Sequence, residues 1–325
     1  MPTQTFTSFE AHLAAVQIAG RTRATLAGKD TSPWTMSSLT LPKLKAQWGQ
    51  AGAGNIIEGT VIPRGVSIYM PFQDAHLVKV NGQRFDSQTL RLQRPDNEYC
   101  LSSTGSHGWF ALHIPNEVID DWNATHASTI GSSSEFIRLT PNRAEMFRRA
   151  VENLGMIVDM APFALESSAA IIATSRKFEA LVRGALCGNA ATTHRLPRHL
   201  ISRRQIVQAV KNYIDQHNGE YISVAELSAV AGISERTLRA AFQDYFGFGP
   251  VRYLKLRVLN LAHKELQNAD SSLTTVTQVA TQFGIWELGR FALDYRLLFG
   301  ELPSETLRLH RSNWDGRKSV VLHQS

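Results

Sequence analysis

The sequence predicts an α+β fold in which short strands come first, a helical hairpin follows and an all-α domain ends the chain. Three observations support this prediction. Between residues 34 and 114, short alternating apolar runs are separated by turn residues. From residue 115 onward, apolar residues recur at helical spacing. After residue 224, one two-helix pattern occurs twice, about 50 residues apart.

The N-terminal region, residues 1–135, is predicted to be rich in β-strands. Asn81-Gly82 gives a strong hairpin signal, because this dipeptide suits a type I′ turn. Many short strands joined by such turns indicate a sandwich or a small barrel. The runs that we expect to form strands are 39–41, 54–59, 66–69, 76–80, 84–85, 90–92, 98–101 and 109–114.

The next region, residues 136–190, is predicted to form two antiparallel helices, over 141–160 and 163–187, with a joint at Pro162. By its pattern alone, this hairpin could pack only against its own β-domain. Residues 191–200 are small and polar and then basic, which is typical of a linker between domains.

The C-terminal domain, residues 201–312, contains the repeated unit of helix, turn and helix. In each copy a glycine ends the first helix, Gly232 and then Gly284, because glycine adopts left-handed turns without strain. Ser234 is a candidate N-cap for the second helix of the first copy. The expected buried positions are Leu227, Val230, Ala231, Leu238, Ala241, Phe242, Tyr245 and Phe246 in the first copy, and Val276, Val279, Ala280, Phe283, Leu288, Phe291, Tyr295, Leu298 and Phe299 in the second.

Two helices joined by a short glycine-containing turn form a helix-turn-helix, whose second helix fits the major groove of B-DNA. A continuous helix over 250–267 is predicted between the two copies. It would hold both recognition helices on one face of the duplex, about 34 Å apart. Its expected apolar side consists of Val251, Leu254, Val258, Leu261, Ala262 and Leu266.

Residues 224–308 resemble the DNA-binding domain of the AraC/XylS family of transcription regulators. The second copy carries the most specific matches, which are Val279-Ala280, Phe283-Gly284, Phe291, Tyr295, Phe299-Gly300, Pro303-Ser304 and Arg308. The resemblance implies a cupin-like barrel at the N-terminus that binds a small-molecule effector, dimerisation through the helical hairpin, RNA polymerase as a partner, and most often activation of transcription.

Double-stranded DNA is the expected partner of the outward side chains of both recognition helices. Arg236 and Arg239 are the best candidates for base contacts, because arginine pairs bidentately with guanine. The second recognition helix departs from the family pattern, since it begins with Trp286-Glu287-Leu288-Gly289-Arg290 instead of small polar residues. We therefore expect it mainly to position the protein on phosphates. The candidate DNA-binding residues are Glu235, Arg236, Thr237, Arg239, Gln243, Trp286, Glu287 and Arg290.

Two of these assignments stay open. Trp286 fits a contact on DNA and a place in the core equally well. Arg257, on the connecting helix, fits a phosphate contact or an ion pair inside the domain.

The candidates for effector binding are Arg64, Arg91, Arg94 and Trp109. The arginines could meet a carboxylate or phosphate, although solvated strand faces are an alternative place for them. The histidines lack the spacing of a metal site, and the sequence shows no nucleophile–base pair. We therefore expect no metal, no cofactor, no catalytic residues and no enzymatic activity. In an alternative reading, the N-terminal domain only dimerises or binds a protein partner.

Composition agrees with a cytoplasmic DNA-binding protein. The formal net charge is +6, which favours a polyanionic partner. Cys100 and Cys187 lie far apart in the sequence and fit a reducing compartment, where each would act as a small core residue. The chain starts without the pattern of a secretory signal, and it contains no apolar run long enough to cross a membrane. The polar and basic tail, residues 313–325, is expected to be loose.

Overall fold

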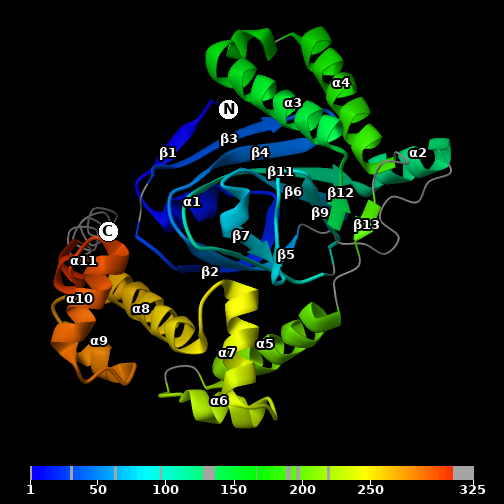
Figure 1. The fold of residues 1–325 in the computed structure, drawn as a ribbon. Helices are drawn as coiled ribbons and strands as arrows, with labels where there is room; N and C mark the ends of the chain where they lie inside the picture. The colour runs from blue at the N-terminus through cyan, green and yellow to red at the C-terminus, as the bar shows by residue number, and fades with distance from the viewer. Residues whose placement is uncertain are drawn as a thin grey trace, which may run out of the picture. The chain divides into compact units, whose positions relative to one another are not determined.

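The structure is a computed structural model that describes residues 2–29, 32–61, 64–95, 97–126, 136–165, 167–187, 192–194, 198–217 and 220–309. It divides into two compact units (Figure 1). Unit 1 contains Met1–Ala24 and Thr31–Leu200, and unit 2 contains Thr25–Asp30 and Ile201–Ser325. The mixed α+β class predicted from the sequence is confirmed, with the strands in unit 1 and a helical domain in unit 2. Parts of the predicted linker and the whole tail 313–325 lie outside the described residues.

Two antiparallel sheets form the centre of unit 1. The larger sheet has eight strands in the order β1-β3-β4-β11-β6-β9-β12-β13, and the smaller has five in the order β2-β5-β10-β7-β8. The bounds in the larger sheet are β1 Gln4–Phe6, β3 Trp34–Thr40, β4 Lys45–Ala51, β6 Gly65–Gln73, β9 Thr89–Gln93, β11 His107–Pro115, β12 Phe136–Arg138 and β13 Thr192–His194. Those in the smaller sheet are β2 Ala19–Leu26, β5 Asn55–Val61, β7 Val78–Val80, β8 Gln83–Arg84 and β10 Tyr99–Ser103.

The predicted barrel is not closed. The two sheets form separate hydrogen-bonded ladders, and no pairing joins one ladder to the other among the described strands. Side chains rather than backbone hydrogen bonds connect the sheets, as the cluster of Val78, Val80, Phe85, Leu101 and Phe136 shows. The predicted hairpin is confirmed between β7 and β8, where Asn81 and Gly82 have φ of 51° and 82°. Cys100 is buried as expected, whereas the side chain of Cys187 is outside the described part of the chain.

Alternation along the strands of the larger sheet separates its two faces. On β11, Trp109 and Ala111 line a cavity between the sheets, whereas Phe110 and Leu112 belong to the core under the helical hairpin. The hairpin consists of α3 (Pro141–Met160), the short helix η2 (Pro162–Leu165) and α4 (Ser168–Cys187). Its inward residues include Phe147, whose ring centre lies 5.7 Å from that of Phe110. The remaining helices of unit 1 are α1 (Phe9–Ala15), η1 (Ala75–Leu77) and α2 (Asn116–His126).

Unit 2 contains the two predicted helix-turn-helix copies. α6 (Val224–Val230) and α7 (Glu235–Phe246) form the first, and α9 (Val276–Gln282) and α10 (Leu288–Phe299) form the second. α8 (Pro250–Asn268) connects them, α5 (Arg198–Gln216) precedes them and α11 (Pro303–Leu309) follows (Figure 1).

The helix ends show why both copies fold alike. Ser223 and Thr275 form capping boxes at the starts of α6 and α9. In the turns, Gly232 and Gly284 have φ of 63° and 70°, a left-handed conformation that favours glycine. The second helices also end alike, at Gly247 and Gly300, with φ of 90° and 80°.

The prediction for the apolar side of α8 is partly wrong. Ala262 and Leu266 are buried, but the rest of the buried side is formed by Pro250, Tyr253, Leu256, Leu259 and His263, and Val251 is 63% exposed. The helix is apolar on two sides, so periodicity alone does not choose between them. The expected burial of Val230 and Leu288 is also wrong, because they are 43% and 38% exposed.

Candidate DNA-binding surface and ligand pocket

α7 presents a polar face opposite its buried side. Leu238, Ala241, Phe242, Tyr245 and Phe246 are buried, as the helical spacing predicts. The Ser234 hydroxyl caps the helix by accepting a hydrogen bond of 3.2 Å from the backbone amide of Thr237. The candidate residues Arg236, Thr237, Arg239 and Gln243 are exposed on the other face, and Glu235 is half-buried.

The polar side chains of α7 differ in their partners. The Arg239 guanidinium donates to the Glu235 carboxylate one turn away, at 2.7 Å. Gln243 donates to the carbonyl of Gly247 at 2.8 Å. Arg236 has no hydrogen-bond or ion-pair partner among the described residues. An exposed intrahelical pair such as Arg239–Glu235 is weak, so the Arg239 side chain can leave it at little cost.

α10 presents a different surface. Trp286 lies in the turn before the helix and is 79% exposed, which decides its open assignment in favour of the surface. Glu287 stands at the N-cap position without a side-chain cap hydrogen bond, whereas the equivalent position before α7 holds Ser234. The exposed side of the helix continues with Leu293 and Leu297, which are 55% and 60% exposed. This surface offers few hydrogen-bond donors, as the sequence predicts.

Arg290 is the basic candidate residue on α10, and it forms an ion pair with Asp294. Its Nε lies 3.1 Å from the Asp294 carboxylate, which also accepts from Lys255 of α8 at 2.7 Å. Burial tends to raise the pKa of Asp294, but the hydrogen bonds from Lys255 and Arg290 outweigh it and keep the pKa low. The carboxylate therefore stays charged and orients both cations. Arg257 pairs with Asp215 at 2.6 Å, which supports the ion pair inside the domain rather than a phosphate contact.

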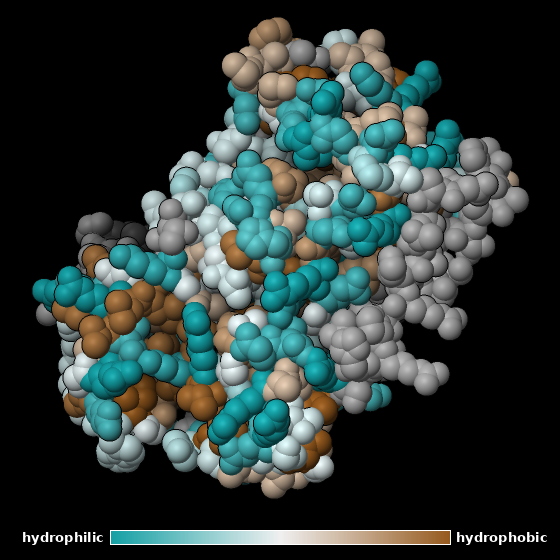
Figure 2. All heavy atoms as spheres, in the orientation of Figure 1, coloured by the Kyte–Doolittle hydropathy of each residue, from teal (hydrophilic) through white to brown (hydrophobic). Residues whose placement is uncertain are grey.

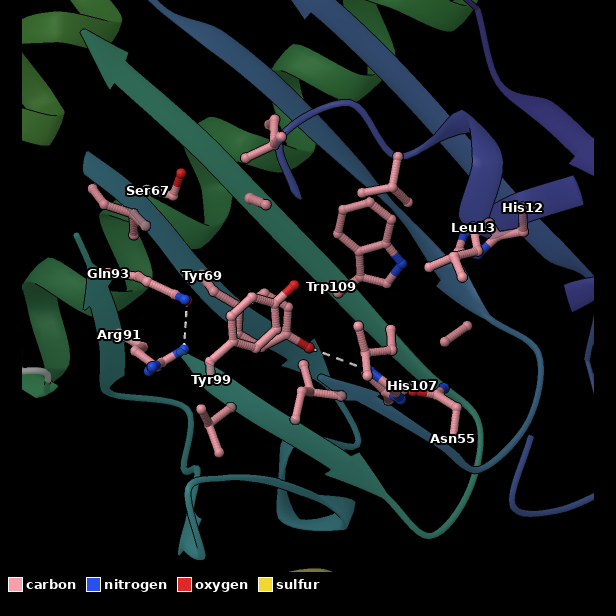
Figure 3. Close-up of a pocket in the computed structure, with 18 of the residues that line it drawn as sticks. His12, Leu13, Asn55, Ser67, Tyr69, Arg91, Gln93, Tyr99, His107 and Trp109 are labelled. Carbon is pink, nitrogen blue, oxygen red and sulfur yellow. Dashed lines mark hydrogen bonds between the residues drawn. The ribbon is translucent and has the colours of Figure 1, made fainter. Parts of the chain in front are cut away.

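A cavity of about 100 Å³ lies in unit 1 between the two sheets (Figure 3). Strands of both sheets and α1 supply its lining. Trp34, Trp109 and Phe9 are among its apolar walls, with ring centres of Phe9 and Trp34 5.1 Å apart. Its polar side chains are His12, Asn55, Ser67, Tyr69, Arg91, Gln93, Tyr99 and His107.

The titratable groups of the cavity are mostly neutral at pH 7. Burial lowers the pKa of His12 and of His107 to about 4, so both imidazoles are uncharged. Burial raises the pKa of Tyr99 to about 12 and also raises that of Tyr69. The Tyr69 hydroxyl lies 3.3 Å from Nε2 of His107. Arg91 therefore carries the charge of the described lining.

The structure places the four effector candidates in two groups. Arg91 and Trp109 line the cavity and are 1% and 6% exposed, which contradicts a solvated strand face for Arg91. Arg64 and Arg94 are not part of the lining, and Arg64 lies in an exposed turn with φ of 68°. Sequence reasoning missed His12 and Gln93. The alternation of β9 could have indicated Gln93, because it lies two positions after Arg91.

Within the described residues, no three His, Cys, Asp or Glu side chains come close enough together to hold a metal ion. The helices described in both units are also too short or too polar to span a lipid bilayer.

Comparisons with known proteins agree on the C-terminal region. Residues 227–309 match a family model described as a helix-turn-helix domain. The chain is 35% identical over 128 residues to XylDLEGF operon transcriptional activator 2 of Pseudomonas putida, covering 37% of this chain and 82% of that protein. Activator 3 of the same operon and organism is 28% identical over 237 residues, covering 71% and 68%. A solved structure, a probable AraC family transcriptional regulator from Rhodopseudomonas palustris, is 41% identical with a TM-score of 0.31, covering 33% of this chain and 98% of that one.

Proposed function

Because the chain belongs to the AraC/XylS family of DNA-binding transcription regulators, we propose that α7 reads bases and that a small molecule bound in unit 1 controls transcription. The observation that carries the first part is the exposed polar face of α7, which has two arginines on the second helix of a helix-turn-helix. Regulation rather than catalysis is the proposed role, in the cytoplasm, where such a protein meets its DNA.

Arg236 and Arg239 are the proposed base readers. Each can donate two parallel hydrogen bonds to O6 and N7 of guanine, which discriminates by about 1–3 kcal/mol. Arg239 would exchange its carboxylate partner, Glu235, for a base. Glu235 lies in the first turn, where a negative charge also favours the helix end. Thr237 and Gln243 complete the proposed reading face.

α10 is proposed to position the protein rather than to read bases. Arg290 and Lys255, both oriented by Asp294, would meet phosphates. Trp286 would press on a sugar or on the methyl group of thymine, because its exposed ring offers apolar surface and a single donor. Glu287 follows it at the N-cap position and is a weaker candidate.

We propose that the protein activates transcription and contacts RNA polymerase from its DNA site. The support comes from the two P. putida relatives, which are named as transcriptional activators. Both are aligned with this chain over at least two thirds of their own length.

The hairpin of α3 and α4 is proposed to form a homodimer. Its inner side packs on the larger sheet, but its outer side and tip expose apolar side chains (Figure 2). Met156, Met160 and Phe163 are 54%, 80% and 69% exposed near the joint of the hairpin. Exposed apolar residues that gather in this way indicate a protein interface.

The domain roles follow from these assignments. Residues 1–135 would form a cupin-like effector-sensing domain, 136–190 the dimerisation hairpin and 201–312 the DNA-binding domain. The cavity between the sheets supports sensing, because mostly apolar pockets with a few polar groups are typical ligand sites. Saturable binding of a small molecule would separate this proposal from a domain that only dimerises or binds a protein.

The experiment that tests the reading role compares Arg239→Ala with Arg84→Ala on a duplex selected by the full-length chain. Arg84 is the control, because it is an exposed arginine on β8 of unit 1, outside the hairpin and outside both helix-turn-helix copies. Arg239→Ala should weaken specific binding about 10-fold or more and relax preference at one base pair. Arg84→Ala should bind like the unmodified protein. Unchanged affinity and selectivity after Arg239→Ala would remove this residue from the proposed readers.

A further inference from the structure

The interior of the second helix-turn-helix copy contains a polar contact where the first copy has two aromatic rings. Tyr295 on α10 is 0% exposed and Thr306 on α11 is 2% exposed, and their hydroxyl oxygens lie 2.8 Å apart. By the spacing of the repeat, they occupy the places of Phe242 and Tyr253 in the first copy, whose ring centres lie 5.4 Å apart. A hydrogen bond therefore joins α10 to the helix that follows it, at a joint where rings meet in the first copy.

The polar contact is part of a longer chain of hydrogen bonds. Nδ1 of His263 on α8 lies 2.6 Å from the hydroxyl oxygen of Tyr295, and the amide nitrogen of Gln267 lies 2.8 Å from Nε2 of His263. At the other end, the hydroxyl of Thr306 donates to the carboxylate of Glu301. The chain connects α8, α10 and α11, and α11 lies beside both other helices (Figure 1).

The carboxylate at the end of this chain sets the direction of every hydrogen bond in it. Glu301 can only accept, so the hydroxyl hydrogen of Thr306 is used there. Tyr295 must then donate to Thr306, and its oxygen accepts from Nδ1 of His263. A neutral His263 with its hydrogen on Nδ1 has a lone pair on Nε2, which accepts from Gln267. All these hydrogens thus have acceptors, and the bonds reinforce one another.

The residue before Tyr295 makes a second connection between α10 and α8. Asp294 lies about 100° away from Tyr295 around the axis of α10. Its carboxylate accepts from Lys255 of α8 at 2.7 Å and from Arg290 at 3.1 Å. Lys255 and His263 are about two turns apart on α8, or about 12 Å along its axis. Polar contacts therefore connect α10 to α8 at two points and in two directions.

These connections limit the rotation of α10 about its own axis. A hydrogen bond weakens when its atoms are misaligned, whereas apolar packing has no preferred direction. Rotation of α10 would misalign the bonds of Asp294 and of Tyr295 together. The exposed side of α10 offers few donors, so its contact with DNA depends on where Arg290 and Lys255 are placed.

We infer that Tyr295 is a positioning residue for DNA binding, because the hydrogen-bond chain through its hydroxyl fixes the rotation of α10 and thereby places Arg290 on a phosphate. This inference rests on the proposed phosphate role of α10, and it names the buried group on which that role depends. Tyr295 itself is buried and acts on DNA only through Arg290.

The test measures the affinity of the full-length protein for its selected duplex at several salt concentrations. The logarithm of the affinity falls with the logarithm of the salt concentration, with a slope of about 0.9 for each phosphate contact. Arg290→Gln should therefore lower this slope by about 0.9. Tyr295→Phe removes only one oxygen atom and should lower the slope by about the same amount, while the base preference under α7 stays unchanged.

Three further variants separate lost positioning from lost stability. Thr306→Val breaks the chain at its next member and should lower the slope, whereas Thr306→Ser keeps the hydroxyl and should retain the slope of the unmodified protein. Val279 is 2% exposed on α9 and outside the chain, so Val279→Ala should lower the melting temperature but leave the slope unchanged. If Tyr295→Phe fails to fold, the two Thr306 variants decide.

NMR of the histidine rings tests the direction of the chain without DNA. In the full-length protein at pH 8, the His263 ring should carry its hydrogen on Nδ1 and none on Nε2. The signal is assigned by its loss in His263→Gln. A hydrogen on Nε2 instead would overturn the chain as described, and the inference with it.

The salt series also distinguishes failure of the inference from failure of the proposed function. If Arg290→Gln lowers the slope but Tyr295→Phe and Thr306→Val do not, the positioning role is wrong and the phosphate role of α10 stands. If Arg290→Gln leaves the slope unchanged, the phosphate role fails and the inference fails with it.

Discussion

Arg91 and Arg239 are both arginines on regular elements, yet they differ in burial and in their partners. The side chain of Arg239 is 62% exposed and pairs with Glu235 in the same helix, an interaction that salt and solvent weaken. Arg91 is buried, and Gln93 and Tyr99 surround its charged end. The first arginine is free to turn toward a large polyanion. The second can meet only a molecule small enough to enter the cavity.

His107 gives a prediction about pH at the same scale. Burial lowers its pKa from 6.5 to about 4. As the pH falls below 6.5, His107 becomes protonated in the unfolded chain, whereas in the folded chain it stays neutral until about pH 4. The free energy of unfolding therefore decreases as the pH falls from 6.5 to 4. The loss from this residue should be about 2 kcal/mol between pH 7.5 and pH 5.

Urea unfolding followed by tryptophan fluorescence at several pH values measures this loss. His12 contributes in the same direction, since its pKa is also lowered to about 4 by burial, and Asp74 faces His107 with an opposing charge. His107→Gln should therefore flatten the decline without abolishing it. An identical decline in the variant and the unmodified protein would show that His107 does not titrate as described.

At the scale of elements, the two helix-turn-helix copies share their framework and differ in their reading faces. Both have a capping box, a left-handed glycine in the turn and a left-handed glycine at the end of the second helix. Only the first has a serine cap before a polar face, whereas the second has Trp286, Glu287 and an apolar outer side. The shared framework explains why both copies fold, and the difference is the basis for proposing that α7 rather than α10 reads bases.

Two glycines of α10 provide a matched prediction. Gly300 has φ of 80°, and a methyl group added there would meet open space, so Gly300→Ala should cost about 1–2 kcal/mol through backbone strain alone. Gly289 is the second residue of the helix, also in open space, so Gly289→Ala should stabilise by about 0.5 kcal/mol or less. Thermal unfolding of both variants checks the pair. A shift of the same sign in both would contradict the assigned conformations.

The elements also show which features the sequence can reveal. The repeat, its glycine turns and the buried stripe of α7 are local patterns, so they were predictable from residues such as Gly232 and Leu238. The strand β4 was not predictable in this way, because it contains Gly49 and glycine is a poor strand former. The structure explains this glycine, since a Cβ there would lie 1.9 Å from the carbonyl oxygen of Thr35 on the neighbouring strand.

The two candidate sites also differ in how far the sequence reveals them. The exposed face of α7 follows from the helical spacing of its apolar residues, so its polar face could be predicted. The cavity depends on pairing between strands distant in sequence, so Arg91 could not be separated from Arg64 and Arg94 in advance. The burial of α8 likewise depends on which of its two apolar sides meets the neighbouring helices.

At the scale of the whole molecule, one chain carries two helix-turn-helix copies on a single connecting helix. α8 fixes their spacing, and two recognition helices on one face of B-DNA would enter the major groove about one helical turn apart. The outer faces of the two recognition helices differ in polarity, so the two halves of the DNA site should differ in how strongly their base sequence is specified. A homodimer through the hairpin would double this two-part site.

The most direct test of this account is selection of preferred duplexes from a random pool by the full-length protein, followed by sequencing. We predict a motif of two blocks with centres about 10 base pairs apart, in which the block read by α7 is strongly specified and the block under α10 is weakly specified. Arg239→Ala should change the strong block. Two equally specified blocks, or a strong block that is unchanged in this variant, would contradict the division of roles between α7 and α10.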